Sequence, residues 1–114
     1  MHELAITEEI LSIALDVANR EEAIQVTNIY LDIGNLSSIV DDSVQFYWDE
    51  IAKNTICADA ILHFNRIPAK LLCRDCKNEF TLGKELIPCP NCKSISLTIL
   101  SGEEFLVHSV DIEK

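Results

Sequence analysis

Residues 73–92 read CRDCKNEFTLGKELIPCPNC, and this stretch decides how the rest of the chain is interpreted. It holds two Cys-x-x-Cys pairs, Cys73 with Cys76 and Cys89 with Cys92, separated by twelve residues. Each pair can place two sulfur atoms on one tight turn, and two such turns can surround one ion with four thiolates. A segment of about thirty residues with few large apolar side chains needs such a metal, because it cannot bury a core of its own. The spacing therefore predicts a structural Zn²⁺ site.

Other uses of the four cysteines are less compatible with the pattern. Four thiolates leave no coordination position for a catalytic water, so a hydrolytic zinc enzyme is not expected. Iron is the main rival ion, because residues 89–92 look like one half of a rubredoxin site; rubredoxins, however, usually have glycine where this chain has Lys77 and Lys93. A thioredoxin-like redox motif has no role for a second pair at this spacing. Cys57 lies outside the pattern and is expected to be a small buried side chain with no ligand role.

Two segments that precede the cysteine pairs have the apolar spacing of helices. The first runs from about Leu4 to Glu22, and its periodic residues include Leu4, Leu11, Ala14 and Ala18. Asp41 or Asp42 can cap the second, and Gln45 completes a capping-box pattern after Asp42. Its apolar stripe consists of Val44, Tyr47, Trp48 and Ile51. We expect Trp48 to anchor the core.

Three further segments alternate apolar and polar residues, as half-buried strands do. Residues 27–33 place Ile29, Leu31 and Ile33 on one face, and residues 58–66 do the same with Ala60, Leu62 and Phe64. Residues 104–112 alternate Leu106, Val110 and Ile112 around His108. The order predicts an α+β fold, a small mixed sheet with two helices plus a zinc-ribbon-like insertion. The expected domains are 1–67 with 102–114 as the α/β body, and 68–101 as the zinc-binding domain.

Composition excludes several classes of function. A chain of 114 residues is one ordinary domain or a small domain with a metal-stabilised insert. The formal charge of −10 argues against nucleic acid as a partner, since phosphate binding needs surplus Lys and Arg. No apolar run approaches the roughly 18 residues that cross a bilayer, and no signal peptide is visible, so we expect a cytoplasmic protein. The charge is uneven: residues 68–100 hold five basic and three acidic residues, a formal +2, and the remainder carries −12.

The N-terminus offers a second metal-binding pattern. Retention of Met1 is expected, because the residue that follows it, His2, is large. The α-amine of Met1, the amide nitrogen of His2 and its imidazole can then chelate one ion through a five-membered and a six-membered ring. Planar nitrogen-rich sites suit Ni(II) and Cu(II), and Glu3 or a partner can supply the fourth ligand.

Met1-His2-Glu3 at the start of a chain of this length, with C-x2-C-x12-C-x2-C in its second half, resembles the HypA/HybF family of hydrogenase nickel-incorporation proteins. The resemblance covers essentially the whole chain. It implies a nickel site on the Met1 amine, His2 and Glu3, and a zinc site on Cys73, Cys76, Cys89 and Cys92. Some family members have a histidine directly after a cysteine pair that exchanges with a zinc ligand, whereas no histidine lies between Pro68 and Gly102 here.

The resemblance also implies a function. The chain would be a metallochaperone rather than an enzyme, and it would carry Ni(II) as cargo to the precursor of a [NiFe]-hydrogenase large subunit, together with a maturation GTPase. Two alternatives stay open: a zinc ribbon that docks protein or nucleic acid, and an electron carrier that holds iron on the cysteines. His63 and His108 are expected to be structural histidines in strands. A hinge at residues 100–102 makes a strand-exchanged homodimer a further hypothesis.

Overall fold

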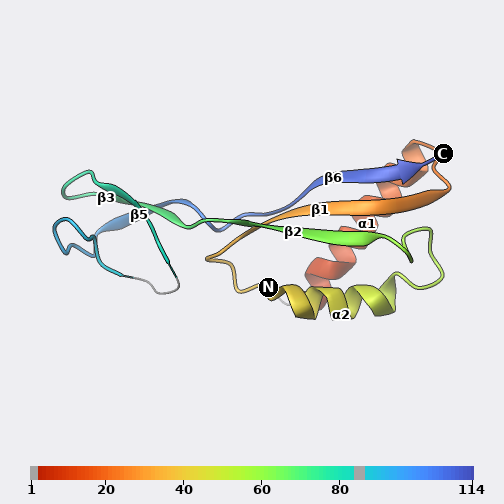
Figure 1. The fold of residues 1–114 in the computed structure, drawn as a ribbon, viewed down its shortest axis with the longest axis horizontal. Helices are drawn as coiled ribbons and strands as arrows, with labels where there is room; N and C mark the ends of the chain where they lie inside the picture. Colours follow the sequence, from red (N-terminus) through yellow and green to blue (C-terminus); the bar gives the residue numbers. More distant parts are fainter. Residues whose placement is uncertain (1–2, 84–86) are drawn as a thin grey trace. The chain divides into compact units, whose positions relative to one another are not determined.

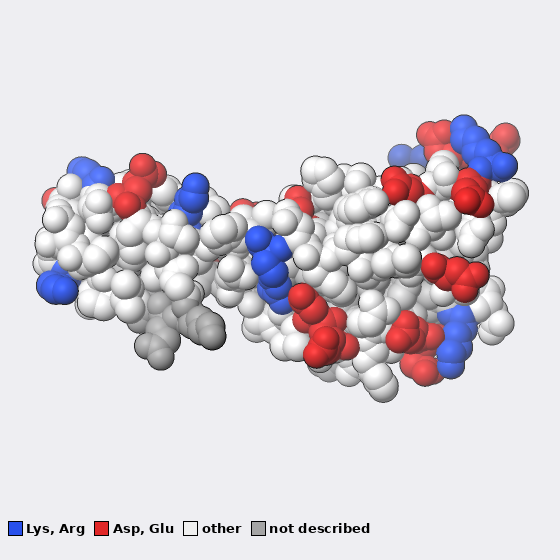
Figure 2. All heavy atoms as spheres, viewed as in Figure 1, with Lys and Arg blue, Asp and Glu red and all other residues white. Residues whose placement is uncertain are grey.

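The computed structural model describes residues 3–83 and 87–114, and the chain divides into two compact units (Figure 1). The first unit consists of Met1–Asp32, Ser38–Asn65 and Leu106–Lys114, and the second of Ile33–Ser37 and Arg66–Phe105. Their charges differ sharply. The first unit holds three basic and fourteen acidic residues, a formal −11, and the second holds six basic and five acidic residues, a formal +1. Acidic groups outnumber basic ones on the visible face of the helical unit (Figure 2).

The first unit contains two helices and a three-stranded sheet, so the predicted α+β fold is confirmed. The helices are α1 (Glu3–Arg20) and α2 (Asp41–Ile51). The sheet has the strand order β2-β1-β6, with β1 (Gln25–Gly34), β2 (Ile61–Ile67) and β6 (Phe105–Glu113). Its core is built from residues spaced four apart on the helices and alternating on β1: Ile6, Ile10, Ala14, Ala18, Val44, Trp48, Ile29, Leu31 and Ile33. Neither helix is long and apolar enough to cross a membrane in the described part of the chain.

Helix α1 ends in a turn that closes its last carbonyl groups. The N–H of Ala23 donates to the carbonyl of Ala18 at 2.9 Å, and that of Glu22 donates to Asn19 at 3.2 Å. These are the two hydrogen bonds of a Schellman motif, which places Glu22 in the left-handed region with φ 55°. The predicted helix of residues 4–22 is therefore confirmed to within two residues at its end.

Helix α2 begins differently from the prediction. Val40 is the N-cap, no side chain caps the helix, and Gln45 donates to Asp49 at 2.9 Å instead of reaching back. The predicted cap at Asp41 or Asp42, and the capping box of Asp42 with Gln45, are therefore wrong. Both carboxylates of the first turn still favour the positive end of the helix dipole. Trp48 is 1% exposed, as predicted, and its Nε1 has no hydrogen-bond partner among the described residues.

Strand β6 shows a second difference from the sequence pattern. Leu106 was expected on the buried face but is 45% exposed, whereas Val107 is half-buried. Two consecutive polar residues, His108 and Ser109, shift the alternation by one position before Val110. A shift of this kind is what a β-bulge produces.

The second unit is built on a smaller antiparallel sheet of order β4-β3-β5. Its strands are β3 (Lys70–Cys73), β4 (Glu79–Thr81) and β5 (Leu97–Ser101), with Leu71 opposite Phe80 and Ile99. The buried cluster contains only Ala69, Leu71 and Leu82, with Phe80 and Leu97 packed against it. So small a core is marginal without a further link.

Two glycines make a close backbone contact in this second unit. The carbonyl of Gly102 accepts the N–H of Leu36 at 2.7 Å, and the N–H of Gly34 donates to Glu104 at 2.7 Å. A Cβ atom on Gly34 would lie 1.9 Å from the oxygen of Gly102. Gly102 itself has φ +113°, a conformation that side chains rarely adopt. This close approach holds residues 33–37 in the unit that carries the cysteines.

Candidate metal centre

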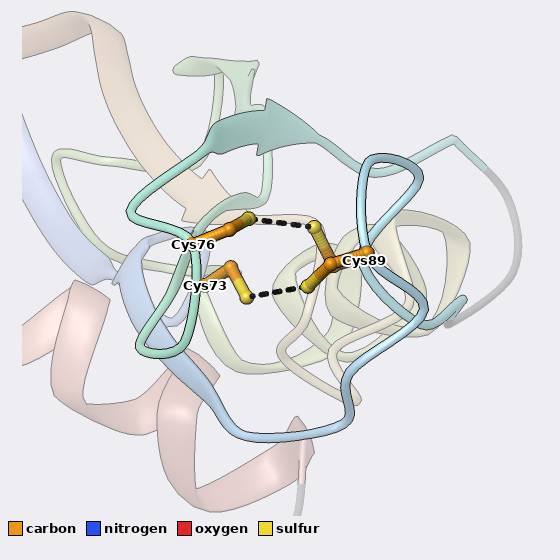
Figure 3. A group of neighbouring side chains, drawn as sticks. Cys73, Cys76 and Cys89 are labelled. Atoms are coloured by element: carbon orange, nitrogen blue, oxygen red, sulfur yellow. Dashed lines mark hydrogen bonds between the residues drawn. The ribbon is translucent and has the colours of Figure 1, made fainter.

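The four cysteines lie together in the second unit. Their Sγ atoms are all within 4.8 Å of one another, and no other group of three or more His, Cys, Asp or Glu side chains in the described chain is arranged to hold an ion. Cys73 ends β3, Cys76 follows on the turn to β4, and Figure 3 shows the sulfur of Cys76 facing that of Cys89. The Sγ atoms of Cys73 and Cys92 lie 3.5 Å apart, and those of Cys76 and Cys89 lie 3.6 Å apart. Tetrahedral zinc with bonds of about 2.3 Å places its sulfurs about 3.8 Å apart, so the donor set fits this ion.

The two cysteine turns have the same backbone hydrogen bonds. In each turn the N–H of the first cysteine donates to the carbonyl of the residue five positions later. The carbonyl of the same cysteine accepts the N–H of the residue four positions later. The four bonds have lengths of 2.8–2.9 Å and join Cys73 N to Asn78 O, Lys77 N to Cys73 O, Cys89 N to Ser94 O, and Lys93 N to Cys89 O. The repeated geometry directs both sulfurs of each turn to one point.

The residue after each pair adopts a left-handed backbone. Lys77 has φ 64° and Lys93 has φ 65°, in the region that glycine enters at least cost. The turn therefore keeps this conformation with lysine in place of the glycine that rubredoxins usually have. Because lysine adopts the backbone conformation that glycine would adopt, the missing glycines do not separate zinc from iron.

The surroundings of the sulfur atoms shift the pKa values of Cys76 and Cys92 in opposite directions. The side chain of Asn91 and the backbone N–H of Asn78 lower the pKa of Cys76 to about 6. The N–H of Ser94 favours the thiolate of Cys92, but the neighbouring sulfurs and desolvation outweigh it and raise the pKa of Cys92 to about 12. Thiolates this close repel one another, and a divalent cation removes that repulsion. The group is suited to a cation rather than to acid-base chemistry.

Of the predicted nickel ligands, only Glu3 belongs to the described part of the chain. Met1 and His2 lie outside it, and Glu3 begins α1, where its carbonyl accepts the hydroxyl of Thr7 at 2.6 Å. Cys57 is fully buried in the loop after α2, and burial raises the pKa of its thiol. It lies outside the metal-binding group, as expected.

Both remaining histidines have partners on the sheet of the first unit. The ring of His63 stacks on Tyr30, with centroids 4.5 Å apart, and its Nε2 lies 2.8 Å from Oδ1 of Asn28. His108 Nδ1 lies 3.3 Å from a carboxylate oxygen of Asp32. These contacts support the structural role that the sequence suggested.

Polar residues around the sulfurs were missed at the level of sequence. Asn78 directs its side-chain amide at Cys89, and Asp75 accepts the hydroxyl of Ser94. Asn78 beside a cysteine pair could have suggested a hydrogen-bond donor to a thiolate, and Asp75 an acceptor for a nearby hydroxyl. Their partners belong to the other turn, however, and a sequence does not show that.

Comparisons with known proteins agree with this geometry. The family model described as "Hydrogenase/urease nickel incorporation, metallochaperone, hypA" matches residues 1–112. A hydrogenase maturation factor HypA from Dehalococcoides mccartyi is 39% identical over 113 residues, which cover 99% of this chain and 95% of the relative. The hydrogenase maturation factor HypA from Geotalea uraniireducens is 36% identical over 113 residues, which cover 99% of this chain and 100% of the relative.

Two solved structures share the fold. The solution structure of the Ni metallochaperone HypA from Helicobacter pylori gives a TM-score of 0.69 at 22% identity, covering 99% of this chain and 98% of that one. A second solution structure, of a HypA protein, gives a TM-score of 0.72 at 22% identity and covers 98% of this chain and 96% of that one. The family description is that of a metallochaperone, in agreement with the expectation that the chain is no enzyme. From the match over residues 1–112, the chain belongs to the HypA family.

Proposed function

We propose that this chain is a nickel metallochaperone that binds Ni(II) at its N-terminus and delivers it for insertion into a [NiFe]-hydrogenase large subunit. The observation that carries the proposal is the match of the nickel-incorporation family model to residues 1–112. That description includes urease as well as hydrogenase, and the similar relatives bear the name of hydrogenase maturation factors. Hydrogenase is therefore the proposed target.

The proposed nickel ligands are the amine of Met1, the amide nitrogen and imidazole of His2, and Glu3. Glu3 is the first residue of α1. The first four N–H groups of a helix have no partner within it, so a backbone nitrogen of Glu3 can bind metal without breaking a helical hydrogen bond. A terminal chelate with an incomplete shell also exchanges its ion more readily than a closed set of four thiolates. These properties suit a site that takes up nickel and gives it away.

The four cysteines are proposed to hold Zn(II) as a structural ion. The sulfur distances support this, as does the small cluster formed by Ala69, Leu71 and Leu82. Zinc can contribute on the order of 10 kcal/mol to folding such a unit. Four thiolates and one Zn²⁺ carry a charge of −2, which the basic residues of this unit can offset. Zinc should therefore remain bound while nickel passes through the other site.

A maturation GTPase and the large-subunit precursor are the proposed partners. The cytoplasm is the proposed compartment, because thiols remain reduced there. The functions are divided between 1–67 with 102–114, which bind nickel, and 68–101, which bind zinc. Strand exchange about residues 100–102 remains a hypothesis for a dimer, and a mass in solution that stays at 12.8 kDa across concentrations would dismiss it.

Nickel titration of three forms of the chain tests the proposal. His2→Ala should lose most nickel binding and keep its zinc, whereas His108→Ala should bind nickel normally. His108 is a matched control because its side chain is 65% exposed and carries the same imidazole. A glycine inserted before Met1 should change the nickel spectrum, since it moves the amine by one residue. Full nickel affinity in His2→Ala would favour the alternative, a zinc module whose second-position histidine is incidental.

A further inference from the structure

The second cysteine turn has little secondary structure to position it. The first turn lies between β3 and β4, which are paired strands of one sheet. Residues 87–96, which carry Cys89 and Cys92, include no helix or strand in the described structure. The segment is anchored at its end, where the N–H of Arg74 donates to the carbonyl of Ser96 at 2.9 Å and Leu97 pairs with Cys73. Nearer the sulfurs, side chains from the first turn supply further links.

Two side chains from the first turn reach the second, and both act on Cys89. The amide nitrogen Nδ2 of Asn78 donates to the Sγ of Cys89 at 3.9 Å. The hydroxyl of Ser94 donates to the carboxylate of Asp75, while the carbonyl of Ser94 accepts the N–H of Cys89 at 2.9 Å. One contact thus holds the sulfur atom and the other holds the backbone beside it.

We propose that Asp75 and Asn78 are positioning residues that hold Cys89 against the first turn, and so set how fast the four-cysteine site releases its metal. This inference rests on the proposed zinc site. Neither residue touches the ion itself. Asn78 acts on the sulfur through its amide, and Asp75 acts through Ser94.

The chemistry of each contact supports this role. The side-chain amide of Asn78 donates to a sulfur that must be a thiolate in order to bind zinc, and such a hydrogen bond stabilises the charge. A carboxylate near a cluster of charge −2 is unfavourable by itself. The bond from Ser94 gives Asp75 a partner and is charge-assisted, so it links the turns more firmly than a bond between neutral groups.

Substitution of Asn78 separates hydrogen bonding from packing. Asn78→Ala should release zinc to an excess of coloured chelator about tenfold faster, the scale known for residues that orient metal ligands. Asn78→Asp has nearly the same shape but presents oxygens to the sulfur, and it should release zinc faster still. If Asn78 only fills space, Asn78→Asp will be the milder variant, and that result would overturn the proposal for this residue.

A double-mutant cycle tests the route through Ser94. Asp75→Ala and Ser94→Ala should each speed zinc release by about tenfold, and the double variant should be no faster than either. Independent roles would give roughly a hundredfold increase in the double variant, and that outcome would overturn the route. Glu79→Ala is the matched control, because it removes one carboxylate from the same unit, and it should release zinc at the wild-type rate.

Two further measurements keep the outcomes distinct. Should Asp75→Ala be isolated without metal, Asp75→Asn retains an oxygen acceptor and should release zinc at a rate between those of wild type and Ser94→Ala. The absorption spectrum of the cobalt form should shift in Asn78→Asp, because the Cys89 sulfur moves or changes its basicity. Wild-type protein without zinc on its cysteines would refute the zinc site itself. Zinc-loaded wild type with unchanged release in every variant would refute only the positioning role.

Discussion

The left-handed lysines after the two cysteine turns allow a quantitative prediction. Lys77 and Lys93 have φ 64° and 65°, and both side chains are exposed. Lys→Ala removes the charge and keeps the unfavourable backbone, whereas Lys→Gly removes the charge and relieves the backbone. The difference between alanine and glycine at one position therefore isolates the backbone contribution.

The magnitude follows from the conformation. A residue with a Cβ atom in the left-handed region costs roughly 1–2 kcal/mol. Glycine avoids this cost, but it destabilises the folded state by about 0.5–1 kcal/mol because it loses more conformational freedom on folding. The glycine variant should thus be more stable than the alanine variant by about 1 kcal/mol, or about fivefold in an equilibrium constant. The charge effect, read from Lys→Ala, should be below about 1 kcal/mol for so exposed a group.

The assay needs a signal from the second unit alone. Trp48, the only tryptophan, and both tyrosines belong to the first unit, so their fluorescence does not report on the cysteine turns. The absorption of Co(II) bound to the cysteines in place of zinc reports on these turns directly. Urea unfolding of the cobalt forms of Lys77→Ala and Lys77→Gly, repeated for Lys93, should give the higher midpoint for glycine in both pairs. Equal midpoints, or a lower one for glycine, would refute the left-handed assignment.

Three other substitutions or conditions give clear expectations. Gly102→Ala should destabilise the second unit by about 2 kcal/mol or more, because it combines φ +113° with a Cβ only 2.7 Å from Cα of Ala69; an unchanged cobalt midpoint in urea would contradict this. Cys73→Ser should lose zinc and unfold the second unit while the fluorescence of Trp48 stays native, and retained stoichiometric zinc would speak against it. Near pH 7 Cys92, with a pKa of about 12, must give up a proton to bind zinc, whereas Cys76, with a pKa of about 6, has already lost its own. Apparent zinc affinity should therefore fall at least about tenfold per unit of pH on acidification, and more steeply below pH 6; affinity independent of pH would exclude this linkage.

Periodic burial made the larger elements predictable from sequence. Ile29, Leu31 and Ile33 alternate on β1 and are all fully buried, because a strand with one covered face imposes a period of two. The same reasoning failed at Leu106, because the alternation of exposed and half-buried residues shifts by one position at His108 and Ser109. It also predicted none of β3, β4 and β5, which are only three to five residues long and too short to show a clear period.

Helix ends were less predictable than helix faces. Asp42 and Gln45 have the spacing of a capping box, but the N-cap is Val40, two residues before Asp42. The carbonyl of Val40 accepts the N–H groups of Ser43 and Val44 at 3.1 Å. Local sequence did not decide between neighbouring starts, since the backbone alone can close the first turn. The prediction was wrong for that reason.

The cysteine site was predictable in its members but not in its surroundings. Spacing alone brought four sulfurs into one group, because each pair needs only a local turn. The contacts of Asp75 and Asn78 depend on how two turns separated by twelve residues face each other. Likewise, Gly34 could be recognised as a strand end, whereas its approach to Gly102 arises only from packing.

Transfer of metal to the client tests the account most directly. The chain, loaded with one equivalent of nickel and one of zinc, would be mixed with the maturation GTPase and the hydrogenase large-subunit precursor, then separated and analysed for both metals. We predict that nickel moves to the precursor while zinc stays with the chain, and that His2→Ala delivers no nickel. Nickel that remains with the chain, or zinc that leaves together with it, would contradict the proposed division between a delivery site and a structural site.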